Sequence, residues 1–238
     1  MRATTVTLAT ADGDMRLYDV EPDGAARGAV IVVQEAFGVN SHIEDVTRRV
    51  ASAGYRAVAP HLYHRSGDPV VGYTEYDKLL PHFKVLSAAG LENDLGASLK
   101  FLADAGFGPK HVGVVGFCMG GTVTFLAAVQ YALGAAVTFY GGGVAEGRFN
   151  LPPQLELARD LQTPWLGFYG GKDRGIPVKD VESLRAAVVA ARVPTEIVRY
   201  DEAGHGFHCD QRPDYHEASA NDAWRRALEW FERFIEAP

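Results

Sequence analysis

Residues 116–120, Gly-Phe-Cys-Met-Gly, constrain this chain more than any other segment. Apolar, β-prone residues lead into the segment at 112–115, and a helix-compatible stretch follows at 122–129. A strand that turns sharply into a helix around Gly-x-Cys-x-Gly is typical of a nucleophile elbow, with cysteine where serine usually stands. The glycines leave room for the turn, since side chains there would clash with the adjoining strand and helix. We therefore expect the Cys118 thiol to lie above a sheet edge at a helix N-terminus, where the helix dipole favours a thiolate.

The composition excludes several classes of protein. With 238 residues, 47% of them hydrophobic, we expect one domain spanning 1–238 with a large core. A formal net charge of -7 without any run of Lys or Arg argues against a nucleic-acid partner. No apolar stretch has the length of a membrane span or of a signal-peptide core, so no membrane partner is expected. The two cysteines, Cys118 and Cys209, form no disulfide framework, which makes a reducing cytoplasm the expected location.

Strands and helices alternate along most of the chain. A hairpin is expected from two strands at 4–8 and 15–20, followed by strands at 29–34, 55–59, 112–115, 135–140, 165–169 and 195–200. Helices are expected at 41–52, 92–102, 122–129, 178–191 and 215–234. This alternation predicts an α/β fold, with a mostly parallel twisted sheet and helices on both faces. Residues 62–90 depart from the alternation, and we interpret them as an excursion over the site.

Polar residues follow three of the predicted strands, where the active sites of parallel sheets lie. The chain order Cys118, Asp173, His205 is the order of nucleophile, acid and histidine in α/β hydrolases. In that geometry His205 would activate the Cys118 thiol, and Asp173 would orient the imidazole. The backbone N–H groups of Met119 and Ala36 would stabilise an oxyanion. Taken singly, Asp173 could be only a turn residue and His205 only a solvated loop residue.

The motifs Gly-Phe-Cys-Met-Gly-Gly, Gln-Glu-x-Phe-Gly-Val-Asn and Ala-Gly-His-Gly-Phe resemble those of the dienelactone hydrolases, or carboxymethylenebutenolidases. The resemblance extends over nearly the whole chain. It implies a single α/β-hydrolase domain that opens unsaturated lactones with a triad of Cys118, His205 and Asp173. It also implies that Glu35 is held near the thiol in the resting enzyme and takes its proton when substrate binds. A carboxylate in that place disfavours the thiolate until binding rearranges the site.

The chain departs from this family in the residues that bind the substrate carboxylate. The family uses arginines, one of which lies four residues after the catalytic histidine, where this chain has Cys209. Other family arginines lie before the elbow, yet residues 67–87 contain no arginine, and their fixed cations are Lys78 and Lys84. Arg65, Arg212 and Lys78 are the remaining candidates. The sequence therefore leaves open whether the pocket accepts a carboxylate.

The leading hypothesis is a cysteine hydrolase whose partner is a small-molecule lactone or activated ester. A general esterase or thioesterase is the second hypothesis, and a non-catalytic ligand-binding or redox-sensing thiol protein is the third. The sequence does not decide between a monomer and a homodimer. We expect no cofactor and no metal, because a cluster of His205, His208, Cys209 and His216 would remove the base from the triad. Substrate contacts are expected from four aromatic residues: Phe37, Tyr63, Tyr76 and Phe207.

Overall fold

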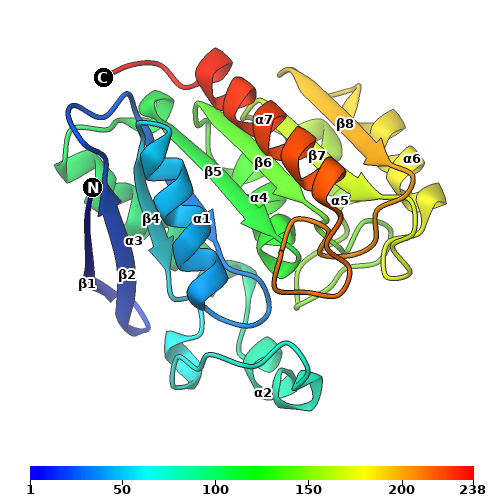
Figure 1. Ribbon diagram of the computed structural model, residues 1–238, viewed down its shortest axis with the longest axis horizontal. Helices are drawn as coiled ribbons and strands as arrows, with labels where there is room; N and C mark the ends of the chain where they lie inside the picture. Colours follow the sequence, from blue (N-terminus) through cyan, green and yellow to red (C-terminus); the bar gives the residue numbers. More distant parts are fainter.

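The computed structural model describes residues 1–238, and an eight-stranded sheet forms its centre (Figure 1). The strands are β1 (Arg2–Thr10), β2 (Gly13–Glu21), β3 (Ala29–Val33), β4 (Arg56–Pro60), β5 (Val112–Phe117), β6 (Ala135–Phe139), β7 (Trp165–Gly170) and β8 (Thr195–Tyr200). Their order across the sheet is β1-β2-β4-β3-β5-β6-β7-β8. Strand β2 runs antiparallel to β1 and to β4, and the remaining neighbours are parallel. The predicted α/β fold with a mostly parallel sheet is confirmed.

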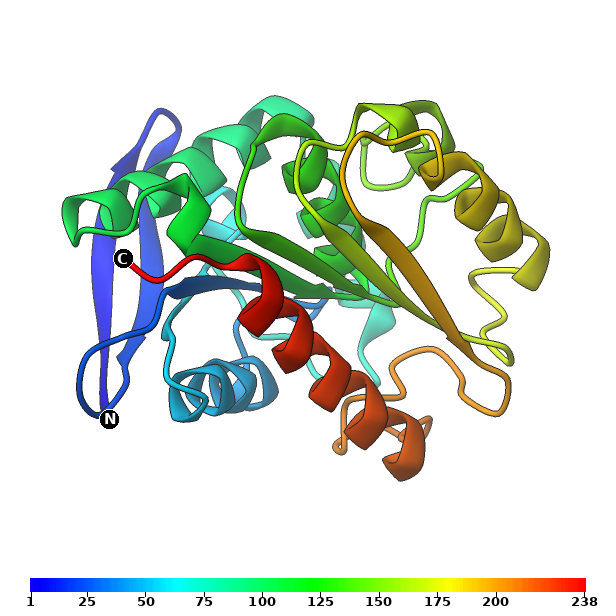
Figure 2. The same ribbon diagram turned by 90° about the horizontal axis from the view of Figure 1, so that it is seen from above.

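Helices cover both faces of this sheet, as expected. Figure 2 shows α1 (Ser41–Ser52) and α7 (Glu217–Phe234) on one face, with α3 (Ala88–Asp104), α4 (Met119–Gln130) and α6 (Val178–Val188) on the other. Every residue of the central strands β3, β5, β6 and β7 is buried, because side chains on both faces meet a helix. The edge strand β1 alternates between exposed and half-buried side chains over its second half. None of the helices combines the length and apolarity needed to cross a bilayer.

Two helix starts differ from the prediction for a local reason. Helix α3 begins four residues earlier than expected, because the Ser87 side chain caps it by accepting the N–H of Gly90. Helix α7 begins at Glu217 rather than at 215, since the imidazole of His216 caps it by accepting the N–H of Ser219. Histidine is not among the usual N-cap residues, so this boundary carried no sequence signal.

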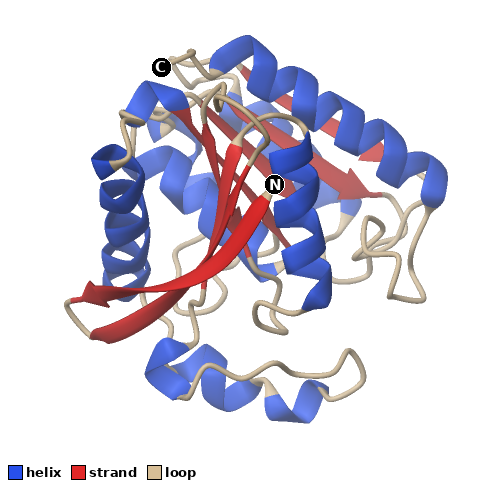
Figure 3. Ribbon diagram, turned by 60° about the vertical axis from the view of Figure 1, so that its left-hand side comes forward, coloured by secondary structure: helices blue, strands red, loops and turns tan.

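The segment 62–90 forms a small layer of its own below the sheet, as Figure 3 shows. Its helical pieces are η1 (His64–Ser66), η2 (Tyr76–Lys78) and α2 (Leu80–Lys84). Five of its apolar side chains, Leu62, Tyr63, Val71, Leu79 and Leu86, belong to the same hydrophobic core as the sheet. This continuity supports a single domain over 1–238, which stays a prediction.

A buried ion pair ties the beginning of this segment to helix α3. Arg65 donates from both terminal nitrogens to the carboxylate of Asp94, at 2.8 and 2.9 Å, and His64 Nε2 lies 3.0 Å from the same carboxylate. The Asp94 side chain is 0% exposed, whereas Asp12, the second carboxylate bound by Arg65, is 41% exposed. Arg65 is therefore a structural residue, which removes it from the candidates for substrate binding.

We expect Asp94→Asn to lower the free energy of unfolding by about 3 kcal/mol, because it leaves the Arg65 guanidinium without its buried counter-charge. Asp12→Asn is the matched control, since it removes an exposed carboxylate from the same arginine and should have little effect. Urea unfolding of the three proteins measures both changes. Equal losses in the two variants would contradict a structural role for the buried pair.

Candidate active site

The turn between β5 and α4 holds Cys118 in a backbone conformation that few side chains adopt. Its φ is 55° and its ψ is −115°, which is strained for a residue other than glycine. A Cβ on Gly116 would lie 2.1 Å from the carbonyl oxygen of Gly120, and one on Gly120 would lie 2.4 Å from the carbonyl oxygen of Val33. Both glycines are needed because α4 packs directly on the backbone of β3 and β5. The structure thus has the strand, turn and helix that the motif predicts.

A chain of hydrogen bonds connects Cys118, His205 and Asp173. His205 Nε2 lies 3.1 Å from Cys118 Sγ, and His205 Nδ1 lies 2.7 Å from Asp173 Oδ2. The other carboxylate oxygen of Asp173 accepts the N–H groups of Gly175 at 2.8 Å and Ile176 at 3.2 Å. These bonds fix the carboxylate, whose side chain is 1% exposed. The fold therefore brings together three residues from separate loops, with 87 positions between Cys118 and His205 and 32 between Asp173 and His205.

The surrounding charges favour a protonated His205. Burial disfavours the imidazolium, but the charges and hydrogen bonds of Cys118 and Asp173 outweigh burial and raise the pKa of His205 to about 10. Below about pH 10 the histidine is therefore cationic when the thiol is ionised. An imidazolium at hydrogen-bond distance stabilises a thiolate, the form in which a cysteine is a strong nucleophile.

Glu35 is fully buried beside this chain but bonds to other residues. Its Oε1 accepts from Arg212 Nη1 at 3.3 Å and from the Tyr140 hydroxyl at 3.5 Å, while Oε2 has no hydrogen-bond partner. The negative charge of Glu35 raises the pKa of Arg212 despite its burial. The Cys118 thiol is hydrogen-bonded to His205 here, and not to Glu35 as the resemblance implies for the resting enzyme. The role of Glu35 in controlling the thiol stays a prediction.

The backbone N–H groups of Met119 and Ala36 are the expected oxyanion hole. Neither donates to another backbone group of the protein. The hydroxyl of Tyr63 donates to the Ala36 carbonyl oxygen at 2.9 Å and lies 3.4 Å from Met119 Sδ. Tyr63 is 0% exposed, so it supports the residues of the expected oxyanion hole and does not face a pocket. The expectation that Tyr63 contacts substrate therefore does not match its position.

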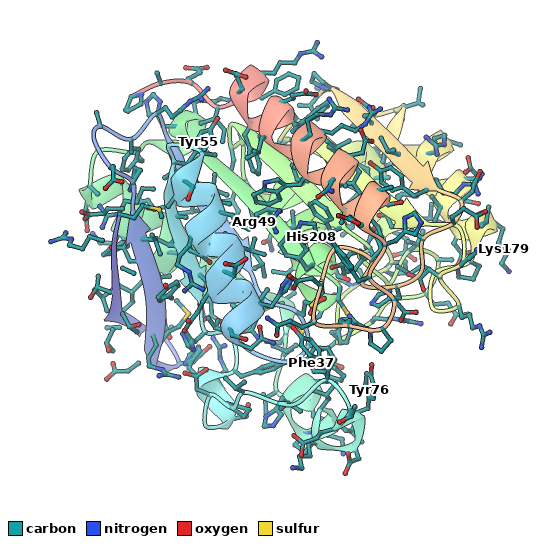
Figure 4. The ribbon with its side chains drawn as sticks, in the orientation of Figure 1. Phe37, Arg49, Tyr55, Tyr76, Lys179 and His208 are labelled. Atoms are coloured by element: carbon teal, nitrogen blue, oxygen red, sulfur yellow. The ribbon has the colours of Figure 1, made fainter.

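A pocket of about 360 Å³ opens above the thiol. Phe37 and Tyr76, two of the predicted substrate contacts, line it, with ring centroids 5.8 Å apart, and Figure 4 shows both below the sheet edge. Phe207 is buried and packs against Tyr140 and Tyr200 instead. The complete lining consists of Ala36, Phe37, Tyr76, Leu79, Phe83, Cys118, Arg148, Phe149, His205 and Arg212. A small apolar ligand with an anionic group fits this combination of aromatic rings and arginines.

Sequence reasoning missed Arg148 and Phe149, which reach the pocket from the loop after β6. Phe149 and Asn150 both have a positive φ, at 56° and 58°, and neither is a glycine that would have signalled the turn. Asn150 donates to the carbonyl oxygen of Leu86 at 2.8 Å, which ties this loop to the 62–90 segment. Phe149 packs edge-on against Phe83 of the same segment. The only available signal was the position of the loop after a parallel strand.

The structure also separates the candidate cations. Arg212 lines the pocket, but its charge is balanced by Glu35. Lys78 is exposed and pairs with Glu75, and it does not line the pocket. Arg148 lines the pocket without any carboxylate partner, and its Nη2 donates to the Gly175 carbonyl oxygen at 3.2 Å. Arg148 is therefore the cation that is free to bind an anionic group.

The four residues weighed as a metal cluster are not one group in the structure. His205 belongs to the hydrogen-bonded chain above, and His216 caps α7. His208 is buried among the rings of Phe117, Phe139 and Trp224, and Figure 4 shows it between α1 and α7. Cys209 is buried, and its thiol contacts the hydroxyl of Tyr73 at 3.3 Å.

The fold and the elbow define the class of this protein, an α/β hydrolase with cysteine at the nucleophile position. The chain belongs to the dienelactone hydrolase family, whose family model matches residues 15–235. It is a hydrolase that acts on ester or lactone bonds. A Salmonella typhimurium relative, provisionally named a carboxymethylenebutenolidase, is 43% identical over 233 residues, which cover 93% of this chain and 83% of the relative. A relative of the same name from Escherichia coli K12 is 43% identical over 214 residues, covering 86% and 76%.

Solved structures agree with this family. A provisionally named dienelactone hydrolase from Klebsiella pneumoniae has a TM-score of 0.89 at 39% identity, with 98% of this chain and 99% of that chain covered. A dienelactone hydrolase-like promiscuous phosphotriesterase from metagenomic libraries has a TM-score of 0.79 at 20% identity, covering 99% and 100%. At that identity the second comparison shows a shared fold alone.

We expect Asp173→Asn to slow the alkylation of Cys118 by iodoacetamide about tenfold at pH 7. The substitution removes the charge that stabilises the imidazolium, so the pKa of His205 falls and a smaller fraction of Cys118 is ionised. In the parent the rate should change little between pH 7 and pH 9, whereas in the variant it should rise with pH.

The rates are measured by mass spectrometry in a Cys209→Ser background, so that one thiol reacts. Asp160→Asn, which changes an exposed carboxylate outside the site, is the matched control. A variant rate equal to the parent rate at every pH would contradict a charge effect of Asp173 on the thiol.

Proposed function

We propose that this protein is a cysteine hydrolase that opens lactones or activated esters through a thioester intermediate. The observation that carries the proposal is the continuous chain from Cys118 through His205 to Asp173 at the elbow. A thiolate suits such substrates because it forms near neutral pH and is highly nucleophilic. It suits amides less well, since their nitrogen must be protonated before it can leave.

In the first half of the proposed reaction, the Cys118 thiolate attacks the carbonyl carbon. The N–H groups of Met119 and Ala36 would stabilise the negative charge that develops on the carbonyl oxygen. The ester C–O bond then breaks, and His205 gives its proton to the leaving oxygen. In a lactone this oxygen stays attached to the acyl chain, so one molecule remains bound as a thioester.

In the second half, water cleaves the thioester. His205, now neutral, takes a proton from the attacking water, and Asp173 holds the imidazole with Nε2 toward the sulfur and the substrate. The C–S bond breaks, the carboxylic acid leaves, and Cys118 returns to the thiolate paired with His205. Both proton transfers use the same nitrogen, so no further acid or base is required.

Glu35 is proposed to keep the thiol inactive between turnovers. Its carboxylate is buried, and one of its oxygens has no partner, so it can accept a proton if the Cys118 side chain turns toward it. Transfer of that proton would restore the thiolate and weaken the ion pair of Glu35 with Arg212. Substrate that reaches Arg212 would favour this transfer, because a second anion then competes with Glu35 for the guanidinium.

The pocket supports a substrate with a carboxylate more than an uncharged ester. Arg148 lines the pocket without a carboxylate partner, and Arg212 lies in the same wall. Charge-assisted hydrogen bonds to a carboxylate stabilise a complex by about 1.5–3 kcal/mol. A carboxylated dienelactone has this combination of a flat unsaturated ring and an anion. A general esterase or thioesterase remains the second candidate, because most of the lining is apolar.

Cys118→Ala should reduce the turnover of a carboxylated dienelactone at least about 10⁴-fold, since it removes the attacking atom. Cys118→Ser should also lose most activity, because His205 and its charged surroundings favour ionisation of a thiol and not of a hydroxyl. Lactone consumption is followed spectroscopically. Turnover retained in the alanine variant would contradict the proposal, and parent protein that releases at most one equivalent of product would indicate a non-catalytic thiol protein.

Arg148→Gln should raise KM for the carboxylated lactone about tenfold or more, in line with one lost charge-assisted hydrogen bond, and leave hydrolysis of an uncharged aryl ester nearly unchanged. Arg174→Gln is the matched control, because Arg174 is exposed and does not line the pocket. Steady-state kinetics on both substrates decide the matter. Efficient aryl ester hydrolysis without lactone hydrolysis in the parent protein would favour the general esterase.

A further inference from the structure

A second group of reactive side chains lies where helix α1 meets the loop that follows His205. His42 is the second residue of α1, and Cys209 and Asp210 follow His205 in the chain. One ligand atom from each of these three residues lies within 4.8 Å of the other two. Cys209 and His42 are buried, while the Asp210 side chain is 71% exposed, so the group opens to solvent on one side.

The imidazole of His42 has no hydrogen bond in the structure although it is 2% exposed. Its Nε2 is buried without a partner, and its Nδ1 faces Asp210, 3.9 Å from the carboxylate oxygen. The Nδ1 atom, which lies on the side of Asp210, accepts no hydrogen bond from the protein and is therefore free to act as a ligand. Neutral imidazole is the form that binds metal ions.

We propose that His42, Cys209 and Asp210 bind a divalent ion of the zinc type. The donor set of one sulfur, one imidazole nitrogen and one carboxylate oxygen suits Zn²⁺ and its spectroscopic substitutes Co²⁺ and Cd²⁺, with water as the fourth ligand. Tetrahedral bonds of 2.0–2.3 Å place donor atoms about 3.3–3.8 Å apart. The present separations, all within 4.8 Å, are therefore about 1 Å or less above this range, and the exposed Asp210 side chain is free to move toward the other two donors.

Binding forms a metal–sulfur bond and releases the thiol proton of Cys209 to solvent, while water leaves the ion. The Tyr73 hydroxyl is positioned to support this change. It now accepts the Cys209 thiol proton at 3.3 Å and also accepts from Asn40 Nδ2 at 3.0 Å. Once Cys209 is a thiolate, the Tyr73 O–H can turn and donate to the sulfur while it keeps the bond from Asn40. Such outer hydrogen bonds orient metal ligands and tune their basicity.

The charges around the group come from several elements and partly balance. Acidic groups from the segment after β3 and from α1 favour the binding of a cation, and two arginines disfavour it. The groups that face His42 or Cys209 are Glu35, Asp45, Arg49, Tyr73, His208, Asp210 and Arg212. The Cys209 thiol donates its proton to Tyr73 in this structure, so the metal must displace that proton.

The site is separate from the catalytic pocket, whose lining includes none of its three ligands. It would join α1 to the loop that carries His205 and Arg212, because the Arg212 N–H donates to the Cys209 carbonyl oxygen at 3.1 Å. Metal binding is therefore expected to hold this loop in one position. The proposal does not depend on the reaction proposed above, because its test measures metal binding and not turnover.

The test uses Cys118→Ala protein, in which Cys209 is the only thiol. Titration with Co²⁺ should produce a sulfur-to-cobalt charge-transfer band and the visible bands of a tetrahedral complex, saturating at one equivalent. Addition of Zn²⁺ should abolish both the charge-transfer band and the visible bands. The apparent Kd should fall about tenfold for each unit of rising pH between 6 and 8, because one thiol proton is released.

Three variants in this background identify the ligands. Cys209→Ser should abolish the charge-transfer band, and His42→Gln should weaken binding at least tenfold. Asp210→Asn should also weaken it at least tenfold and is the safest for folding, because the side chain is exposed. Asp45→Asn, an exposed carboxylate on α1 that is not a ligand, is the matched control. The proposal is overturned if Co²⁺ gives no thiolate band, if the band survives Cys209→Ser, or if Asp210→Asn and Asp45→Asn bind alike.

Discussion

The close packing of helix α4 against the backbones of β3 and β5 is the constraint on which the rest of the site depends. Only glycine at 116 and 120 allows this approach, since a Cβ at either position would overlap a carbonyl oxygen. The approach forces the strained backbone at Cys118 and holds its thiol at the helix N-terminus. Everything else in the site, from the histidine to the pocket wall, is arranged around an atom whose place is set by backbone contacts.

Near the Cys118 thiol, each buried charged side chain has a partner of opposite charge. Asp173 faces His205, and Glu35 faces Arg212, so each of these buried carboxylates has a partner. Pairing lowers the cost of burying each group. Arg148, which has no carboxylate partner, is the exception, and it lines the pocket.

Prediction from the sequence succeeded where the signal is local. The elbow, the buried strands and the positions of Asp173 and His205 after their strands all follow from short patterns, and the structure has them. Prediction failed for Tyr63 and Phe207 because an aromatic side chain near a site can turn toward the core or the pocket, and packing decides which. Arg148 was missed since the glycines of its loop indicate a turn but not where its side chains point, and Arg65 was misplaced because its partner Asp94 lies on another helix.

The sequence by itself determined the family, the sheet and the position of Cys118 at the elbow, because glycine spacing and apolar runs limit what the backbone can do. Only the tertiary structure decided which side chains surround its thiol. The pairing of Glu35 with Arg212, the free charge of Arg148 and the meeting of His42 with Cys209 all join residues from different elements. Such contacts depend on side-chain direction and on the distance between loops, and neither leaves a periodic pattern in the sequence.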